Sequence, residues 1–129
     1  MPPSRAAGFE ELLAVSRWVI VPTQLERLSL EGVTFMARTA RKLQQRDEQG
    51  PRLLGIVPNM ARRTIEHREQ LKELVETFGP TVWTPIPQSV RVSEACGYGD
   101  VMYQHAPDHK VTKALRRIGA RFIENTEAP

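Results

Sequence analysis

Two short apolar runs separated by a long amphipathic segment constrain the fold of this chain most strongly. The runs are Arg17–Val21 and Leu53–Val57, and the second is continuously apolar, as in a strand covered on both faces of a parallel sheet. Between them, residues 29–46 repeat apolar side chains at helical spacing. Strands that alternate with helices form parallel strand–helix–strand units, so the pattern predicts an α/β fold.

A further helix and strand are predicted downstream. Residues 65–78 carry apolar side chains at i, i+3, i+4 and i+7, which predicts a helix. Gly79 and Pro80 are typical of its end, since glycine adopts a left-handed conformation and proline cannot continue the helix. Residues 81–83 predict a short strand. We therefore expect about three parallel strands flanked by helices, with a short helix over residues 8–16.

The C-terminal quarter predicts less regular structure. A single helical turn is expected over residues 91–95, broken at Gly97–Gly99. The last helix is expected to begin near Asp108, which is a good N-cap residue. Residues 1–124 are predicted to form the folded part and residues 125–129 a frayed tail. Pro22 and Pro58 are expected to end the first two strands.

Length and composition exclude several classes of protein. The chain has 129 residues, 40% hydrophobic and 26% charged, which suits one small globular domain. The sequence contains no apolar stretch long enough to cross a membrane, so we expect no membrane partner. One cysteine, Cys96, cannot form an internal disulfide. These features predict a cytoplasmic location.

Cations gather in two places, although the net charge is only +3. Residues 110–123 hold five cations and no acid, and a second group surrounds the start of the helix at 65–78. Such patches can contact the phosphates of duplex DNA regardless of its sequence. Judged by charge alone, however, a face of this kind more often only contacts solvent. The candidate DNA-binding residues are Arg62, Arg63, Arg68, Arg91, Lys110, Lys113, Arg117 and Arg121.

Metal and nucleophile signals are weak. His105 and His109 are four residues apart, but Pro107 between them disfavours a continuous helix that would bring both to one metal. Cys96 has no histidine linked to it in sequence and is better explained as a small apolar residue. No catalytic residue and no metal ligand is predicted.

Several short motifs occur in a specific order along the chain. The most specific is the block Ile86–Ala95 followed by Gly99, and weaker ones precede it: Pro2–Ser4, Val19–Pro22, Leu30–Gly32, Leu54–Val57, Met60 and Arg63–Thr64. The ordered set resembles the C-terminal half of ParA/Soj-type partition ATPases, the deviant Walker A family that also includes MinD. Two segments depart from the family pattern, Met60–Arg62 and Val111–Leu115.

The resemblance implies a P-loop NTPase fold represented by its C-terminal half, over residues 1–124. It implies that Asn59, Met60, Ile86 and Pro87 form the adenine-side wall. It also implies ATP and magnesium in the complete protein, homodimerisation, non-specific DNA binding, a ParB-like centromere-binding partner and a nucleoid location. The chain has no Gly-Lys-Thr/Ser loop to hold phosphates and magnesium. We therefore expect no ATP hydrolysis and no tight nucleotide binding by this chain alone.

Three alternatives stay open. Asn59 could simply satisfy backbone groups in a turn. The chain could be a non-enzymatic module that binds DNA or a protein partner without a P-loop. It could also be a non-functional remnant of a partition ATPase gene.

Overall fold

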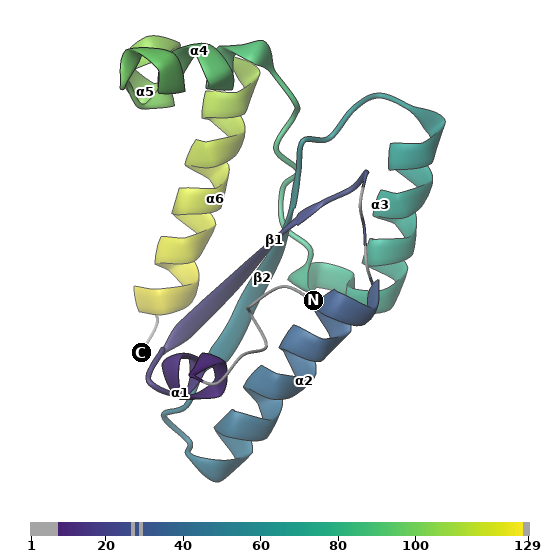
Figure 1. Ribbon diagram of the computed structural model, residues 1–129, viewed down its shortest axis with the longest axis vertical. Helices are drawn as coiled ribbons and strands as arrows, with labels where there is room; N and C mark the ends of the chain where they lie inside the picture. The colour runs from purple at the N-terminus through teal and green to yellow at the C-terminus, as the bar shows by residue number, and fades with distance from the viewer. Residues whose placement is uncertain (1–7, 27, 29, 128–129) are drawn as a thin grey trace. The chain divides into compact units, whose positions relative to one another are not determined.

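The computed structural model (Figure 1) describes residues 8–26, 28 and 30–127. The motif Pro2–Ser4 lies outside these residues. Where one domain was expected, the chain divides into two compact units: residues 1–21 with 29–55, and residues 22–28 with 56–129. Two strands, β1 (Trp18–Gln24) and β2 (Arg52–Asn59), pass from the first unit into the second and pair in a parallel sheet.

The first unit also contains α1 (Phe9–Ala14) and α2 (Leu30–Arg46). The rings of Phe9 and Phe35 stack with their centroids 6.3 Å apart, which joins the two helices. The turn before β2 requires glycine at position 50, because a Cβ there would lie 2.8 Å from the Asp47 carbonyl oxygen. The backbone N–H of Gly50 donates to that same oxygen over 2.7 Å. The helix predicted over residues 29–46 and the strands predicted at Arg17–Val21 and Leu53–Val57 are all present in the structure.

Both strands continue through the prolines that were expected to end them. β1 reaches Gln24 and β2 reaches Asn59, so the predicted ends at Pro22 and Pro58 are wrong. Pro22 is exposed, and a proline is tolerated in a strand where its missing N–H faces an unpaired edge. Pro58 uses only its carbonyl oxygen, which accepts a hydrogen bond from the N–H of Ile86 over 2.8 Å.

The second unit contains the remaining helices, which are α3 (Ile65–Phe78), a 3-10 turn η2 (Gly79–Thr81), α4 (Val90–Tyr98), α5 (Met102–His105) and α6 (Lys110–Glu127). α4 and α5 lie at the N-terminal end of α6 (Figure 1). Buried Ala95, Met102 and Val111 join these three helices in one apolar cluster, with Ile86 and Leu115 packed against it. The α3 prediction is confirmed at both ends. Gly79 has a positive φ of 59°, but its ψ of −134° differs from the left-handed helical conformation that was predicted.

The predicted third strand is reduced to two isolated parallel bridges. Val82 pairs with Ile56, and Pro87 pairs with Ala61, in the same register. Between the bridges, Pro58 and Pro85 both lack the N–H that the intervening rung would need. The segment therefore follows β2 as an irregular strand, and the described sheet has two strands where about three were expected.

Three predicted helix boundaries differ from the structure. α4 does not end at Ala95 but continues to Tyr98, where Gly99 with φ 71° stops it. α6 begins at Lys110, two residues after the expected N-cap Asp108. The same helix continues to Glu127, so residues 125–127 are helical where a frayed tail was expected. Thr126 Oγ1 donates to the Phe122 carbonyl oxygen over 2.8 Å in this last turn.

Candidate functional site

The C-terminal end of β2 turns sharply at Asn59 and Met60. The Asn59 side-chain oxygen Oδ1 accepts the Met60 N–H over 2.9 Å. Met60 has a φ of 54°. Among the described residues, it is the only one other than glycine with a positive φ. That conformation is costly for a residue with a Cβ and is found preferentially near functional sites. Because Oδ1 accepts only one of the two hydrogen bonds it can accept, the Asn59 amide can still offer a ligand its two N–H donors and one acceptor site.

The segment that contains Ile86 and Pro87 is hydrogen-bonded directly to this turn. The Ala61 N–H donates to the Ile86 carbonyl oxygen over 3.0 Å, and the Gln88 N–H donates to the Ala61 carbonyl oxygen over 3.0 Å. Upstream, the Trp83 N–H donates to the Ile56 carbonyl oxygen over 2.8 Å. These bonds fix the irregular strand beside the end of β2, so residues almost thirty positions apart in sequence become neighbours.

A cavity of about 320 Å³ opens at this point. Its lining includes Asn59, Met60, Ile86 and Pro87, the four residues that the family resemblance suggested for an adenine-side wall. The other lining residues are Gln88, Ser89, Val92, Ser93, Met102, Val111 and Leu115. The volume is at the lower end of the range typical of small-molecule sites, and apolar walls with a few polar groups are typical of such sites.

Most of the additional lining residues were missed by the sequence analysis. Val111 and Leu115 belong to the apolar stripe of α6, which the periodicity assigned to the core. Met102 comes from α5, a helix of four residues that was not predicted. Ser89 lies two residues after Pro87, and its place in the most specific motif was the one signal that could have included it.

His109 connects the cavity to the start of α6. Its Nδ1 accepts the Val111 N–H over 3.1 Å, so it caps α6 in place of Asp108. Its Nε2 lies 3.3 Å from the Ser89 hydroxyl oxygen. The same hydroxyl caps α4, since it accepts the Arg91 N–H over 3.1 Å. One imidazole thus ties together the N-termini of two helices that contribute to the cavity.

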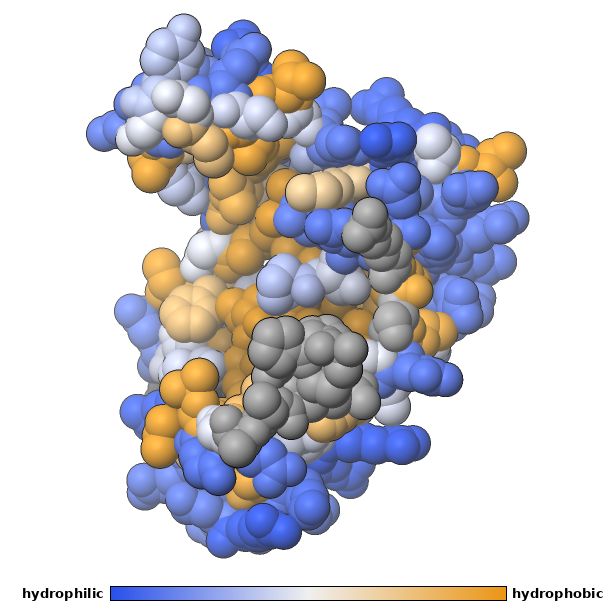
Figure 2. All heavy atoms as spheres, viewed as in Figure 1, coloured by the Kyte–Doolittle hydropathy of each residue, from blue (hydrophilic) through white to orange (hydrophobic). Residues whose placement is uncertain are grey.

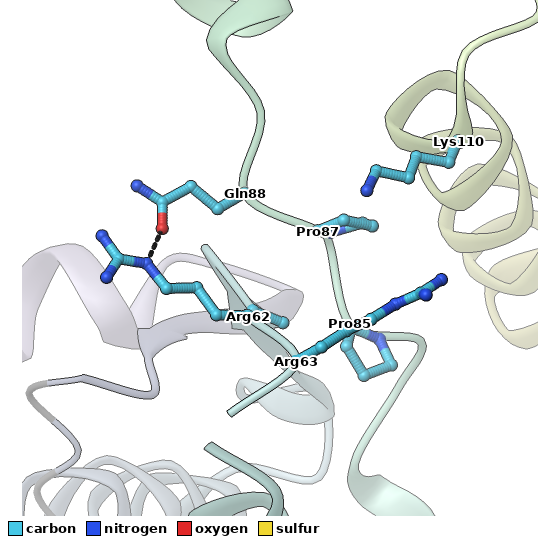
Figure 3. A pocket seen from close by; sticks show the side chains of 7 residues that line it. Arg62, Arg63, Pro85, Pro87, Gln88 and Lys110 are labelled. Atoms are coloured by element: carbon cyan, nitrogen blue, oxygen red, sulfur yellow. Dashed lines mark hydrogen bonds between the residues drawn. The ribbon is translucent and has the colours of Figure 1, made fainter. Parts of the chain in front are cut away.

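A second cavity of about 360 Å³ lies next to the first and shares Pro87 and Gln88 with it. Arg62, Arg63 and Lys110 line it, together with Ala61 and Pro85 (Figure 3). The Nε of Arg62 donates to Oε1 of Gln88, and the Arg62 backbone N–H donates to Nδ1 of buried His67 over 2.8 Å. Three of the candidate DNA-binding cations are therefore brought together at one place.

The other candidate cations differ in whether they have partners. Arg121 donates from Nη2 to the Pro80 carbonyl oxygen over 2.6 Å and lies 5.0 Å from the ring centroid of buried Trp83. Arg91 lies 3.9 Å from a carboxylate oxygen of Glu94. By contrast, the side chains of Arg68, Lys113 and Arg117 are exposed, and none of them forms an ion pair or a hydrogen bond with any described residue.

No metal centre is formed by the described residues: they contain no group of three or more His, Cys, Asp or Glu that could hold an ion. His105 lies between two carboxylates, 3.6 Å from Glu94 and 3.8 Å from Asp100. Its ring also stacks on Tyr98, with the centroids 5.7 Å apart. His109 instead belongs to the helix caps described above.

The surface near α4 and α5 is partly apolar. Val90, Tyr98 and Val101 are each more than half exposed. Figure 2 shows orange apolar side chains mixed with blue hydrophilic ones over this region, at the upper left. No helix in the described part of the chain is both long and apolar enough to span a bilayer.

Comparison with known proteins gives close relatives, although no family model matches the chain. It is 36% identical to the chromosome-partitioning ATPase Soj of Thermus thermophilus over 98% of its own length and 51% of that protein. The chain is a homologue of the Soj/ParA proteins. The chromosome partitioning protein ParA of Caulobacter vibrioides is also 36% identical, over 76% of this chain and 38% of that protein. This Soj/ParA homologue spans about half the length of the curated relatives it matches, and the match is to their C-terminal half, as predicted.

A solved structure supports the fold. The cell division ATPase MinD of Pyrococcus furiosus superposes with a TM-score of 0.63 over 86% of this chain and 44% of that one. The sequence identity is 17%, so this likeness concerns the fold alone. The predicted α/β fold of the P-loop NTPase type is confirmed.

Proposed function

We propose that this Soj/ParA homologue supplies the base-binding wall and part of the DNA-binding surface of a partition ATPase. The observation that carries the proposal is the cavity at the end of β2, because four residues from two separate segments line it together: Asn59, Met60, Ile86 and Pro87. The ends of parallel strands are where open α/β sheets bind ligands. The relationship to Soj and ParA supports ATP as that ligand.

The chemistry of the cavity suits a purine base. Apolar side chains such as Ile86 and Leu115 can cover the faces of a planar ring. The Asn59 amide keeps its N–H donors, which complement the acceptor nitrogens of adenine. The hydroxyls of Ser89 and Ser93, which also line the cavity, add polar groups. All the residues that line this cavity belong to the second unit.

The phosphate chemistry requires a part that these 129 residues do not contain. The sequence has no Gly-Lys-Thr/Ser loop to surround the phosphates of ATP and hold magnesium. We therefore propose that hydrolysis needs a P-loop segment together with this chain. Homodimerisation, a ParB-like partner and a nucleoid location follow from the same proposal, by analogy with the family.

The free cations support the DNA part of the proposal. Lys110, Lys113 and Arg117 are spaced three and four residues apart along α6, so they share one face. Arg63 and Arg68 add charge at the start of α3. Arg121 belongs to the structural contacts with Pro80 and Trp83, so we leave it out of the proposed surface. Contacts of this kind bind duplex DNA regardless of sequence and weaken steeply with salt.

Two experiments test this proposal. In the first, the chain is combined with a segment carrying a Gly-Lys-Gly-Gly-x-Gly-Lys-Thr loop, and ATP hydrolysis is measured. Activity that disappears when the last lysine of that loop is replaced by alanine, and that weakens in Asn59→Ala, would support the ATPase proposal. Absence of activity in a soluble, folded complex would contradict it.

The second experiment measures duplex DNA binding by the chain without nucleotide. The free cations belong to this chain itself, which favours binding that needs no P-loop, as expected for the non-enzymatic alternative. Binding that the double variant Lys113→Gln/Arg117→Gln weakens would support the DNA surface. A folded chain that binds no DNA at low salt, alone or in the ATP-bound complex, would contradict it.

A further inference from the structure

The second cavity has a lining of unusual charge. Of its seven lining residues, three are cations and none is acidic. Its volume of about 360 Å³ is sufficient for a small anion and part of the molecule that carries it. Pro85 and Pro87 provide rigid walls without backbone N–H groups.

The three cations do not have the same role. Arg62 is held in place by its hydrogen bonds to Gln88 and His67. In Figure 3 the side chains of Arg63 and Lys110 extend on the other side of the Pro85–Gln88 segment, away from the Arg62–Gln88 hydrogen bond. Both are exposed, and neither forms an ion pair or a side-chain hydrogen bond with any residue in 8–26, 28 and 30–127. Two charged groups at this cavity are therefore free to bind a ligand.

Helix N-termini add further positive potential. Arg63 directly precedes Thr64, the N-cap of α3, and Lys110 is the first residue of α6. Gln88 precedes Ser89, the N-cap of α4. A cation at a helix N-terminus opposes the helix dipole. The three cations that line the cavity repel one another as well as the nearby helix N-termini, and an anion would relieve this repulsion.

We infer that this cavity binds a phosphate group between Arg63 and Lys110. A guanidinium can donate two parallel hydrogen bonds to phosphate oxygens, and an ammonium supplies a compact charge on the opposite side. The Arg62–Gln88 pair supports the wall behind them. The phosphate can belong to a small anion or to a polynucleotide, since both present the same oxygens. The site shares Arg63 and Lys110 with the proposed DNA surface, so for a polynucleotide phosphate the inference rests on that proposed function. For a small anion, it does not depend on the other cations of that surface, which are Arg68, Lys113 and Arg117.

The first test uses the unmodified chain with inorganic pyrophosphate as the probe. Saturable binding should be detected by isothermal titration calorimetry, and amide NMR shifts should concentrate at Ala61–Arg63, Gln88 and Lys110. No saturable binding at low ionic strength, or shifts that are spread over all exposed cations, would overturn the inference.

Charge-removing variants give a second, matched test. Arg63→Gln and Lys110→Gln should each weaken pyrophosphate binding by about tenfold or more, because each removes a charge-assisted contact. Lys113→Gln and Arg117→Gln remove the same charge from α6 outside the cavity and should change affinity by less than about twofold. Equal effects from all four variants would indicate non-specific attraction and overturn the inference. Circular dichroism verifies folding, and Arg63→Ala or Lys110→Ala, which also remove the charge, replace any variant that fails to fold.

A short duplex distinguishes the two sources of phosphate. If the cavity holds a polynucleotide phosphate, duplex DNA should displace pyrophosphate, and Arg63→Gln should weaken both ligands. If it holds a small anion, the duplex should leave pyrophosphate bound. In that case DNA binding should depend mainly on the cations of the proposed surface that lie outside the cavity, such as Lys113 and Arg117, so failure of the phosphate site and failure of the DNA surface give different results.

Discussion

The imidazole of His109 accepts the Val111 N–H at one nitrogen and lies 3.3 Å from the Ser89 hydroxyl at the other. The acceptor role fixes Nδ1 as the unprotonated nitrogen of the neutral ring, so Nε2 carries the hydrogen and donates it to Ser89. The helix caps of α4 and α6 are in this way parts of one hydrogen-bonded unit. Stability should therefore depend on the side chain of His109 more than on that of its neighbour Asp108.

His109→Ala should lower the free energy of unfolding by about 1 kcal/mol or more, the usual value for loss of an N-cap. Asp108→Ala is the matched control, since no described hydrogen bond uses the Asp108 side chain; it should change stability by less than about 0.5 kcal/mol. Urea denaturation followed by circular dichroism measures both. A larger loss in Asp108→Ala would mean that Asp108 caps the helix after all.

The positive φ of Met60 gives a prediction about side-chain shape. Met60→Val should destabilise the chain by about 1–2 kcal/mol, because a β-branched residue is poorly suited to a left-handed backbone. Met60→Asn should be close to neutral, since asparagine adopts this conformation more readily. Thermal unfolding of the two variants measures the difference, and similar midpoints would show that the turn is not left-handed in solution.

Substitutions at Arg121 and Arg117 should have different effects, the first on stability and the second on DNA binding. Arg121→Ala should lower the free energy of unfolding by about 1–2 kcal/mol, because it removes a charged hydrogen bond to Pro80 and the contact with Trp83. Arg117→Ala should leave stability unchanged and weaken DNA binding. Chemical denaturation and fluorescence anisotropy give the two readouts. The reverse pattern would mean that the roles are exchanged.

The slope of log DNA affinity against log salt concentration should reflect the number of phosphates that the chain contacts. Replacing both Lys113 and Arg117 with glutamine should reduce the slope of log affinity against log salt by about 1.8, which corresponds to two lost contacts on duplex DNA. Arg91→Gln should reduce it by less, since Glu94 already lies near Arg91. Anisotropy titrations over a range of salt concentrations test this, and an unchanged slope in the double variant would exclude these two residues.

The regular elements could be predicted because their signals are local. The β-branched run at Val19–Val21 and the periodic residues of α3 determine a strand and a helix with little help from the rest of the chain. Pro22 and Pro58 do not end their strands because a proline removes a hydrogen bond on one side of a strand only, and the strand can continue through pairing on its other side. Whether such a neighbouring strand exists cannot be read from the local sequence. The predicted third strand is irregular because Pro58 and Pro85 remove hydrogen bonds between it and β2, and this pairing could not be read from the local sequence either.

The candidate site was predictable in part. Asn59 and Ile86 come together because both follow strand-like segments, which the family resemblance identified. The periodicity of α6 shows that Val111 and Leu115 face inward, but it cannot distinguish a filled core from a cavity. Arg117 and Arg121 are four residues apart and lie on the same face of α6. Only Arg121 has a structural role, because it contacts Pro80 and Trp83, which are distant in sequence. Contacts of that kind leave no pattern in the local sequence.

Pro87 and Gln88 belong to the walls of both cavities, so the apolar space on one side and the charged space on the other are separated by a single stretch of chain. If a ligand in one cavity displaced this shared wall, it would widen that cavity and narrow the other. The affinities of the two cavities would then be coupled, and the coupling would be equal in both directions.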